Sequence, residues 1–238
     1  MVAKYVSIYK HYLDKIRAGV YTAGDKFPTE KEIASEFGVS RDTTRKALAL
    51  LQKDGVISRN QGSGSTVINH EFYNFSLTSN YSFKEWTKLA GFNGKTKLLE
   101  MEFMDADEKI KNYFNTHKDF RVCYIKRYRY IDGEKAFLDV NYILEECVEG
   151  ITQEIVENSL YDYVENIKGY EISYVDRMIF AQLPTPEEKE EWGLNDSECF
   201  LTTEGQAFLK NGKIFNYTIV KHRNKYKFKE VSHRDKIL

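Results

Sequence analysis

Residues 28–67 decide the fold of the first part of the chain and read PTEKEIASEFGVSRDTTRKALALLQKDGVISRNQGSGSTV. Thr29 and Glu32 form a capping-box pattern, in which each side chain bonds the other residue's backbone N–H, and this pattern predicts a helix start. Gly38 predicts a tight turn, because glycine adopts positive φ without steric cost. Ser40 is a second N-cap. The stretch therefore predicts two short helices joined by a turn.

The second helix and the residues after it complete the pattern. Thr44, Leu48 and Leu51 recur at helical spacing, and Gly55 ends the helix. Two short β-rich segments then flank a glycine-rich turn. This order predicts a winged helix-turn-helix, whose second helix enters the major groove of DNA. The alternative is a small helical hairpin whose arginines are only solvated, and the order of cap, turn, Ser-Arg start and Gly-x-Gly hairpin favours DNA binding.

The predicted DNA contacts lie at the start of the second helix and in the wing. We expect Arg41 and Arg45 to read bases, most simply guanines, because a guanidinium matches the guanine edge. The other expected contacts are Lys31, Ser40, Thr43, Thr44, Gln61, Gly62 and Ser63.

This stretch closely resembles the DNA-binding domain of GntR-family bacterial transcription regulators, which place this domain first. The resemblance implies that the chain binds double-stranded operator DNA. The sequence departs from the family pattern at one position, because many relatives carry Lys or Arg between the two wing glycines, where this chain has Ser63.

The totals fit a soluble two-domain protein. The chain has 238 residues, 42% of them hydrophobic, which suits one large or two modest domains. Three widely separated cysteines in no metal-ligand spacing predict reduced thiols in the cytoplasm. We expect no signal peptide and no membrane span, since no apolar run is long enough.

Charge is distributed unevenly along the chain. The net charge is −1, but residues 1–69 hold eleven Lys and Arg against seven Asp and Glu, a net of +4, so the remainder carries −5. This asymmetry favours a basic DNA-binding part joined to an acidic second domain.

The predicted organisation is α+β. We expect a support helix over 4–18, the winged domain over 1–69, a linker over 70–80 and a second domain over 81–238. In that domain, Asp132-Gly133 and Asn211-Gly212 predict two hairpins, so its sheet is mainly antiparallel. We expect further strands over 98–104 and 171–181, and helices over 82–90, 107–114, 151–167 and 185–193.

The second half resembles the effector domain of the HutC subgroup, a UTRA-like domain with a chorismate-lyase-like fold that binds a ligand. The segments that carry this resemblance are IKRYRYIDGEKAFLDVNYI, SLYDYVE and FLKNGKIFNYTIVKHRNKYKF. The last segment is most similar to repressors of trehalose operons. The resemblance therefore implies a sugar phosphate effector, with trehalose 6-phosphate as the first candidate.

Arg127 and Arg129 are the central candidates for the effector site. They alternate along one strand, so they share a face, where they either meet an anion or lie in solvent beside acids such as Asp132 or Glu134. The family pattern places both arginines, Ser159 and Tyr226 at ligand contacts. Asp139 stands where many relatives have Glu. The expected effector-binding residues are Ser82, Phe83, Arg127, Arg129, Asp139, Ser159, Glu204 and Tyr226.

These observations predict a homodimeric repressor that binds a palindromic operator and needs neither cofactor nor metal. Other anions fit the arginines too, among them an amino sugar phosphate, an amino acid or a histidine-pathway acid. A lyase-like enzyme is disfavoured, because the five histidines form no catalytic or metal-binding pattern. Activation instead of repression stays open.

Overall fold

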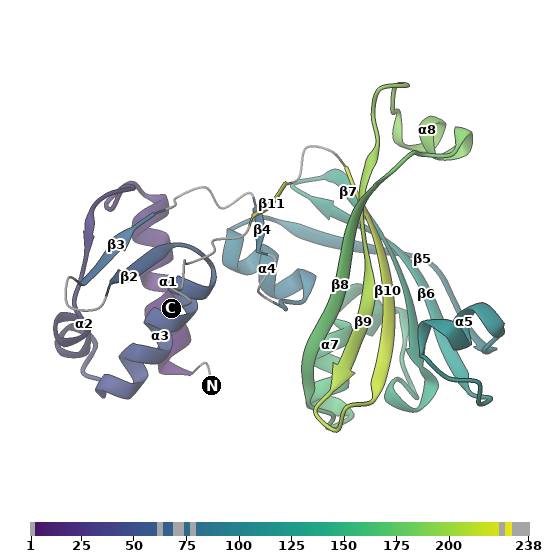
Figure 1. Ribbon diagram of the computed structural model, residues 1–238, viewed down its shortest axis with the longest axis horizontal. Helices are drawn as coiled ribbons and strands as arrows, with labels where there is room; N and C mark the ends of the chain where they lie inside the picture. The colour runs from purple at the N-terminus through teal and green to yellow at the C-terminus, as the bar shows by residue number, and fades with distance from the viewer. Residues whose placement is uncertain (1–2, 61–63, 69–73, 77–79, 224–226, 230–238) are drawn as a thin grey trace, which may run out of the picture. The chain divides into compact units, whose positions relative to one another are not determined.

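The computed structural model describes residues 3–60, 64–68, 74–76, 80–223 and 227–229. The chain divides into two compact units, one formed by Met1–Ser79 with Tyr226–Leu238 and the other by Asn80–Lys225. The expected α+β class is confirmed (Figure 1). The expected boundaries at residues 69 and 81 stay predictions.

The described residues of the first unit form three helices and a small three-stranded sheet. The helices are α1 (Lys4–Arg17), α2 (Glu30–Phe37) and α3 (Arg41–Lys53). The strands β1 (Lys26–Phe27), β2 (Ile57–Asn60) and β3 (Gly64–Val67) form an antiparallel sheet in the order β1-β3-β2. This is the helix-turn-helix and hairpin that the sequence predicts.

The predicted helix signals are present in the structure. Thr29 and Glu32 form a complete capping box at the start of α2. Gly38 adopts φ 58°, in the left-handed region where glycine is favoured. The hydroxyl of Ser40 accepts a bond from the backbone N–H of Thr43 at 3.2 Å. These caps fix where the turn lies and how α3 begins.

The first unit also contains a strand pair that the sequence did not predict. The expected linker holds β4 (Asn74–Ser76), which pairs in parallel with β11 (Lys227–Lys229). This pairing joins two segments that lie far apart in the sequence. It is why β11, the last strand among the described residues, belongs to the first unit.

The second unit is a six-stranded antiparallel sheet in the order β5-β6-β7-β10-β9-β8. Its strands are β5 (Gly94–Asp105), β6 (Arg121–Ile131), β7 (Glu134–Leu144), β8 (Ile172–Gln182), β9 (Phe200–Leu209) and β10 (Ile214–His222). Its helices are α4 (Phe83–Ala90), α5 (Glu108–Tyr113), η1 (Glu145–Cys147), α6 (Gln153–Asn158), α7 (Leu160–Asp162), η2 (Tyr163–Ile167) and α8 (Pro186–Trp192).

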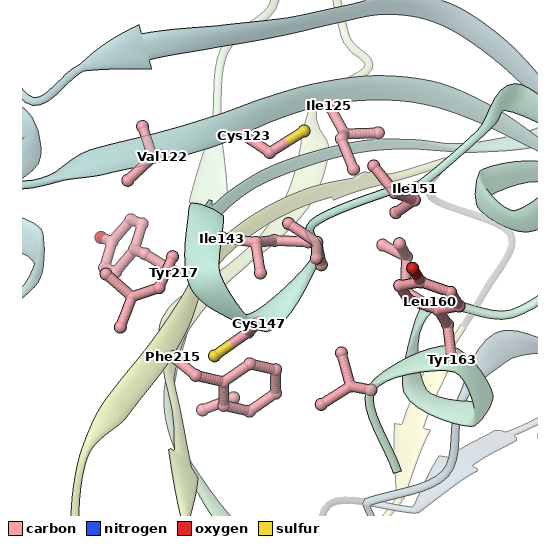
Figure 2. Packing of buried hydrophobic residues seen from close by; sticks show 14 of the residues in the cluster. Val122, Cys123, Ile125, Ile143, Cys147, Ile151, Leu160, Tyr163, Phe215 and Tyr217 are labelled. Carbon is pink, nitrogen blue, oxygen red and sulfur yellow. The ribbon is translucent and has the colours of Figure 1, made fainter. Parts of the chain in front are cut away.

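Helices cover both faces of this sheet. In Figure 1, α4 and α7 lie on one side of it and α5 on the other. We call the side of α4, α6 and α7 the inner face. At one end of that face, Cys123, Ile125 and Ile143 pack against residues of η1, α7 and η2 (Figure 2). The other end of the inner face is polar, and it holds the candidate effector site.

One predicted helix is broken. The pattern over 151–167 predicts a single helix, but the structure has α6, α7 and η2. Ser159 is extended, at φ −156° and ψ 113°, and its hydroxyl caps α7. A local bond from Ser to the backbone competes with helix continuation, which explains the break.

Candidate functional site

The N-terminal end of α3 presents exposed cations. Arg41, Arg45 and Lys31 are exposed, as expected for side chains that contact DNA. The hydroxyls of Ser40 and Thr43 lie 2.9 Å apart and bond to each other at the helix start. These five expected contacts therefore lie on or beside the first turn of α3 and on α2.

Glu30 connects this helix to the wing. Its two carboxylate oxygens accept bonds from Arg45 Nε at 3.1 Å and from the Arg59 guanidinium at 2.6 Å. The carboxylate therefore fixes the direction of Arg45 before any DNA is bound. The sequence does not reveal this role of Glu30. An acidic residue in the first turn of a helix is common, because it interacts favourably with the positive end of the helix dipole.

Thr44 is a correction to the expected DNA contacts. Its side chain is fully buried, and its hydroxyl donates to the carbonyl of Ser40 at 3.3 Å. The apolar stripe of α3 rotates this position into the core, so it cannot reach DNA. Gln61, Gly62 and Ser63 lie outside the described residues.

The strand register brings the polar end of the inner face together. Arg127 on β6 pairs with Asp139 on β7, and Arg129 pairs with Phe137. On β10, Thr218 pairs with Asn141 and His222 with Phe137. Gly205 on β9 pairs with Thr218 on β10 and, on its other side, with Arg177 on β8. Since paired residues of a sheet point to the same side, these side chains share one face.

Both expected arginines are buried and share one carboxylate. Arg127 is 2% exposed and Arg129 8%. Asp139 Oδ2 accepts bonds from Arg127 at 2.7 Å and from Arg129 at 2.8 and 3.0 Å. Arg127 also donates to the Val156 carbonyl at 3.0 Å, and Arg129 to Thr96 at 2.6 Å. The solvent-facing alternative with Asp132 or Glu134 does not occur.

A chain of amides and hydroxyls extends from Arg127. Asn141 Oδ1 accepts from Arg127 at 2.6 Å, and its amide donates to Thr218 at 2.9 Å, as does that of Asn216. Two buried acceptors, Asp139 Oδ1 and Asn216 Oδ1, have no hydrogen-bond partner among the described residues. Buried acceptors of this kind are suited to bonds from ligand hydroxyls.

Arg177 and His222 extend the polar end toward the edge of the sheet. His222 Nε2 lies 3.2 Å from the Thr203 hydroxyl, and Arg177 and Asp139 are its electrostatic neighbours. Arg177 forms no ion pair with a carboxylate within the described ranges, and desolvation lowers its pKa although the neighbouring Tyr161 acts in the opposite direction. On this face of the sheet, three guanidiniums therefore stand against one carboxylate.

Burial changes the acid–base behaviour of the cluster. Burial and Arg129 lower the pKa of Arg127 to about 9, so it stays protonated at neutral pH. Burial alone would raise the pKa of Asp139, but the two guanidiniums outweigh it and the pKa is lowered. Burial and Arg177 lower the pKa of His222 to about 3, so this imidazole is neutral.

Of the other expected effector residues, Phe83 contacts the cluster, whereas Ser82 and Ser159 serve as helix caps. The Phe83 ring packs 4.9 Å from the Arg129 guanidinium. Ser82 caps α4. Its backbone N–H already donates to the Glu85 carboxylate at 2.8 Å, so this N–H is not available to a ligand. Ser159 is buried and caps α7. Tyr226 lies outside the described residues.

Glu204 is not brought to this site. It follows Thr203 on β9, so it points to the opposite face, where its carboxylate accepts a bond from Tyr217. The alternation of side chains along a strand excludes it from the cluster around Arg127. It is therefore a correction to the expected effector contacts.

Several residues of the cluster were missed from the sequence. They are Asn141, Tyr161, Arg177, Thr203, Asn216, Thr218 and His222. Asn216 and Thr218 do alternate with Phe215, Tyr217 and Ile219 along one strand, which is a usable signal for a polar inner face.

The described part of the chain contains no cluster of residues that could hold a metal ion. Within the same ranges, no helix is long and apolar enough to cross a membrane.

The chain belongs to the bacterial regulatory proteins of the gntR family and carries a UTRA domain. The family models match residues 4–67 for the gntR domain and 89–227 for the UTRA domain. Together with the exposed start of α3, this makes the chain a DNA-binding transcriptional regulator of the GntR/UTRA type, and not an enzyme.

Individual relatives support this assignment. The chain is 34% identical over 236 residues to the transcriptional regulator TreR of Bacillus subtilis, covering 99% of both chains. It is 27% identical to the mannosyl-D-glycerate system repressor MngR of Escherichia coli, covering 89% of both. The crystal structure of the possible regulator YydK of Bacillus subtilis matches 99% of this chain and all of its own, with TM-score 0.77 and 27% identity.

The effector unit has a solved counterpart as well. The effector binding domain of the Bacillus subtilis trehalose repressor is 31% identical, with TM-score 0.52, and covers 60% of this chain and 99% of its own. The HutC-like assignment made from the sequence is confirmed.

Proposed function

We propose that this regulator is a cytoplasmic, homodimeric repressor that leaves a palindromic operator when it binds a sugar phosphate. Trehalose 6-phosphate is the first candidate effector. The similarity to TreR over the whole chain supports this choice. The observation that carries the proposal is the shared buried carboxylate, Asp139, which pairs with two arginines and leaves positive charge in excess.

The chemistry of the inner face suits a phosphate. Buried guanidiniums are costly unless an anion compensates them, and their fork geometry matches phosphate oxygens. Arg127 and Arg129 are buried, and Arg177 is an exposed residue on the same face of the sheet. Together with Asp139, the three guanidiniums give the sheet residues of the cluster a charge of +2. A phosphate monoester carries about −1.5 to −2 at neutral pH, so its charge matches this excess.

The remaining acceptors suit a sugar. Asp139 Oδ1 and Asn216 Oδ1 would accept hydrogen bonds from sugar hydroxyls. The amides of Asn141 and Asn216 both donate to the Thr218 hydroxyl, and these bonds hold the two amides in place. A site with cations at one point and buried acceptors at another discriminates a phosphorylated sugar from free phosphate, because each unmet acceptor would weaken binding.

The ligand would act on DNA binding through the segment before α4. Phe83 packs on Arg129 and begins the first helix after the expected linker, so a phosphate drawn to Arg129 competes with this contact. The coupling required is about 1–3 kcal/mol. The ligand must bind the DNA-incompetent state more tightly, since equal affinity shifts nothing.

In the dimer, each DNA-binding domain would contact one half-site of the operator. Arg41 and Arg45 would contact base edges, Lys31, Ser40 and Thr43 would contact phosphate or bases, and Arg59 would steady the wing through Glu30.

A thermal-shift screen of the full chain tests the effector. Trehalose 6-phosphate, other sugar phosphates, amino sugar phosphates and the unphosphorylated sugars are compared. A ligand at a hundredfold excess over its Kd stabilises by about 2.7 kcal/mol. We expect stabilisation by a phosphorylated sugar and none by its free sugar. No shift with any sugar phosphate would contradict the proposal.

Two variants of the same strand locate the binding site. Arg129→Gln removes one buried cation while Arg127 still pairs with Asp139, and we expect it to abolish the shift. Arg121→Gln is the matched control, because Arg121 forms only exposed pairs with Asp105 and Glu145. An unchanged shift in a folded Arg129→Gln protein would place the phosphate elsewhere.

A further inference from the structure

The solvent-facing side of α3 carries two charged residues that are not among the DNA contacts expected from the sequence. The side of the helix that faces the core is formed by Thr44, Ala47, Leu48 and Leu51. The opposite side is exposed and is formed by Asp42, Lys46, Ala49 and Lys53. At 3.6 residues per turn, these four residues lie within about 40° of the direction opposite Thr44. A recognition helix turns this side toward the base edges of the major groove.

Asp42 and Lys46 form an exposed ion pair on this side of the helix. Lys46 Nζ lies 3.0 Å from Asp42 Oδ2, and the two side chains are 62% and 74% exposed, respectively. The two residues are one helical turn apart, so both lie near the start of α3. Arg45 lies about 100° around the helix from Thr44, on the side where Glu30 links it to the wing. The ion pair and Arg45 therefore face different parts of the groove.

The carboxylate of Asp42 restricts what this ion pair can contact. DNA phosphates repel a carboxylate, so the favourable position for Asp42 is over base edges and away from the backbone. Base edges in the major groove include hydrogen-bond donors, among them the N4 amino group of cytosine. Asp42 also neutralises part of the charge of Lys46, which weakens the attraction of this lysine for phosphate. Both effects favour a contact of the pair with bases.

We propose that Asp42 and Lys46 together read one G·C base pair of the operator. Lysine donates to guanine O6 and N7, and aspartate accepts from cytosine N4. Guanine O6 and cytosine N4 are neighbours within one base pair, and the ion pair presents a donor and an acceptor 3.0 Å apart to match them. Ala49, the next exposed residue on this side, is short and lets the helix approach closely. The inference rests on the proposed function, because it requires α3 to lie in the major groove.

Binding of duplexes changed at single base pairs by the full chain tests this assignment. A duplex that the protein selects from a random pool is altered at one base pair at a time, and fluorescence anisotropy gives each affinity. Replacing the G·C pair read by Asp42 and Lys46 should weaken wild-type binding by about 5- to 150-fold. Asp42→Ala and Lys46→Ala should each remove most of this penalty at the same position. The penalty at the position read by Arg45 should stay unchanged in both variants.

The controls separate base reading from folding and from general DNA affinity. Each penalty is a ratio of two affinities of one variant, so a partly unfolded preparation leaves it unchanged. Lys53→Ala removes an exposed cation from the same side of α3, roughly 16 Å further along the helix from Asp42, and should keep every penalty. The double variant Asp42→Ala/Lys46→Ala should lose no more discrimination than either single variant, because both side chains contact the same base pair.

Two results would overturn the assignment. If Asp42→Ala keeps every penalty, Asp42 only stabilises the start of the helix. If Lys46→Ala weakens all duplexes equally and lowers the salt dependence, Lys46 contacts phosphate and not a base. Failure of the proposed function is recognised separately. If Arg45→Ala also keeps every penalty, α3 reads no bases, whereas a loss of discrimination with Arg45→Ala alone rejects only the role of Asp42 and Lys46.

Discussion

At the scale of single residues, Asp139 controls how much positive charge the inner face offers to a ligand. One of its oxygens neutralises parts of two guanidiniums, and the other is left as an acceptor. A carboxylate in this position therefore acts in two ways. It makes the burial of Arg127 and Arg129 tolerable, and it keeps an acceptor available for a hydroxyl.

His222 leads to a prediction on acid stability. In the unfolded chain, histidine takes up a proton near pH 6.5, whereas folded His222 stays neutral down to about pH 3. Protonation then favours the unfolded state, so the free energy of unfolding falls as the pH drops below 6.5. Between pH 7 and 5 we expect a loss of about 1–2 kcal/mol from this residue.

Denaturant unfolding followed by tryptophan fluorescence measures this loss. Both tryptophans, Trp86 and Trp192, lie in the effector unit. The variant His222→Gln cannot take up the proton, and its pH dependence should be shallower by that amount. If wild type and variant lose stability equally between pH 7 and 5, His222 is not the titrating group.

The position of Asp139 shows what sequence could not predict about the site. The Asp132-Gly133 turn predicts a register in which Arg127 faces Leu138. Between Arg129 and Tyr130 the pairing shifts by one residue, with Ala136 as the extra residue, so Arg127 faces Asp139 instead. A one-residue shift exchanges the two faces of a strand. The arginines themselves were predicted, because two cations with period two share a face whatever the register.

At the scale of elements, α3 carries the DNA-binding prediction. Arg45 is exposed and held by Glu30, and Arg45→Ala should weaken operator binding by about 5- to 150-fold if it makes a bidentate base contact. Fluorescence anisotropy with a duplex selected by the protein from a random pool measures the affinity. Discrimination at one base position should also relax.

Arg17→Ala is the control for Arg45→Ala. Arg17 lies in the last turn of α1 and pairs with Asp14 at 3.2 Å. We expect its removal to leave sequence discrimination intact. Equal effects of the two substitutions would remove Arg45 from the base-reading residues.

The pairing of β8 with β9 depends on Gly205. A Cβ atom at this position would lie 1.9 Å from the carbonyl oxygen of Asp176. Gly205→Ala therefore forces the two strands apart and should destabilise the effector unit by about 1–3 kcal/mol. Denaturant unfolding measures the loss, with the exposed Ser173→Ala on β8 as the control. Full stability of Gly205→Ala would show that β8 moves away without cost.

Elements with local signals were predicted well, and elements that depend on distant partners were not. The caps at Thr29 and Ser40 and the turn at Gly133 lie within a few residues of what they determine. β4 and β11 form because each supplies the other's hydrogen bonds across about 150 residues of chain. No local pattern reveals such a pair.

At the scale of the whole molecule, the chain carries a basic DNA-binding part and an acidic effector part. The first 69 residues hold a net charge of +4 and the remainder −5. A single DNA-binding unit neutralises few phosphates, so its affinity for DNA is weak; two such units on one operator would approximately double the contacts and make the affinity fall more steeply with salt. The function class was predictable because both resemblances rest on continuous segments, whereas the cluster around Asp139 depends on the register of the folded sheet.

The measurement that tests the central claim most directly is operator affinity with and without effector. Anisotropy of the selected duplex is titrated with the full chain in the absence and presence of saturating trehalose 6-phosphate, with trehalose as the control. We predict a loss of affinity of about 5- to 150-fold with the phosphorylated sugar alone. Unchanged affinity, under conditions where the same compound stabilises the protein, would contradict release from DNA by a sugar phosphate.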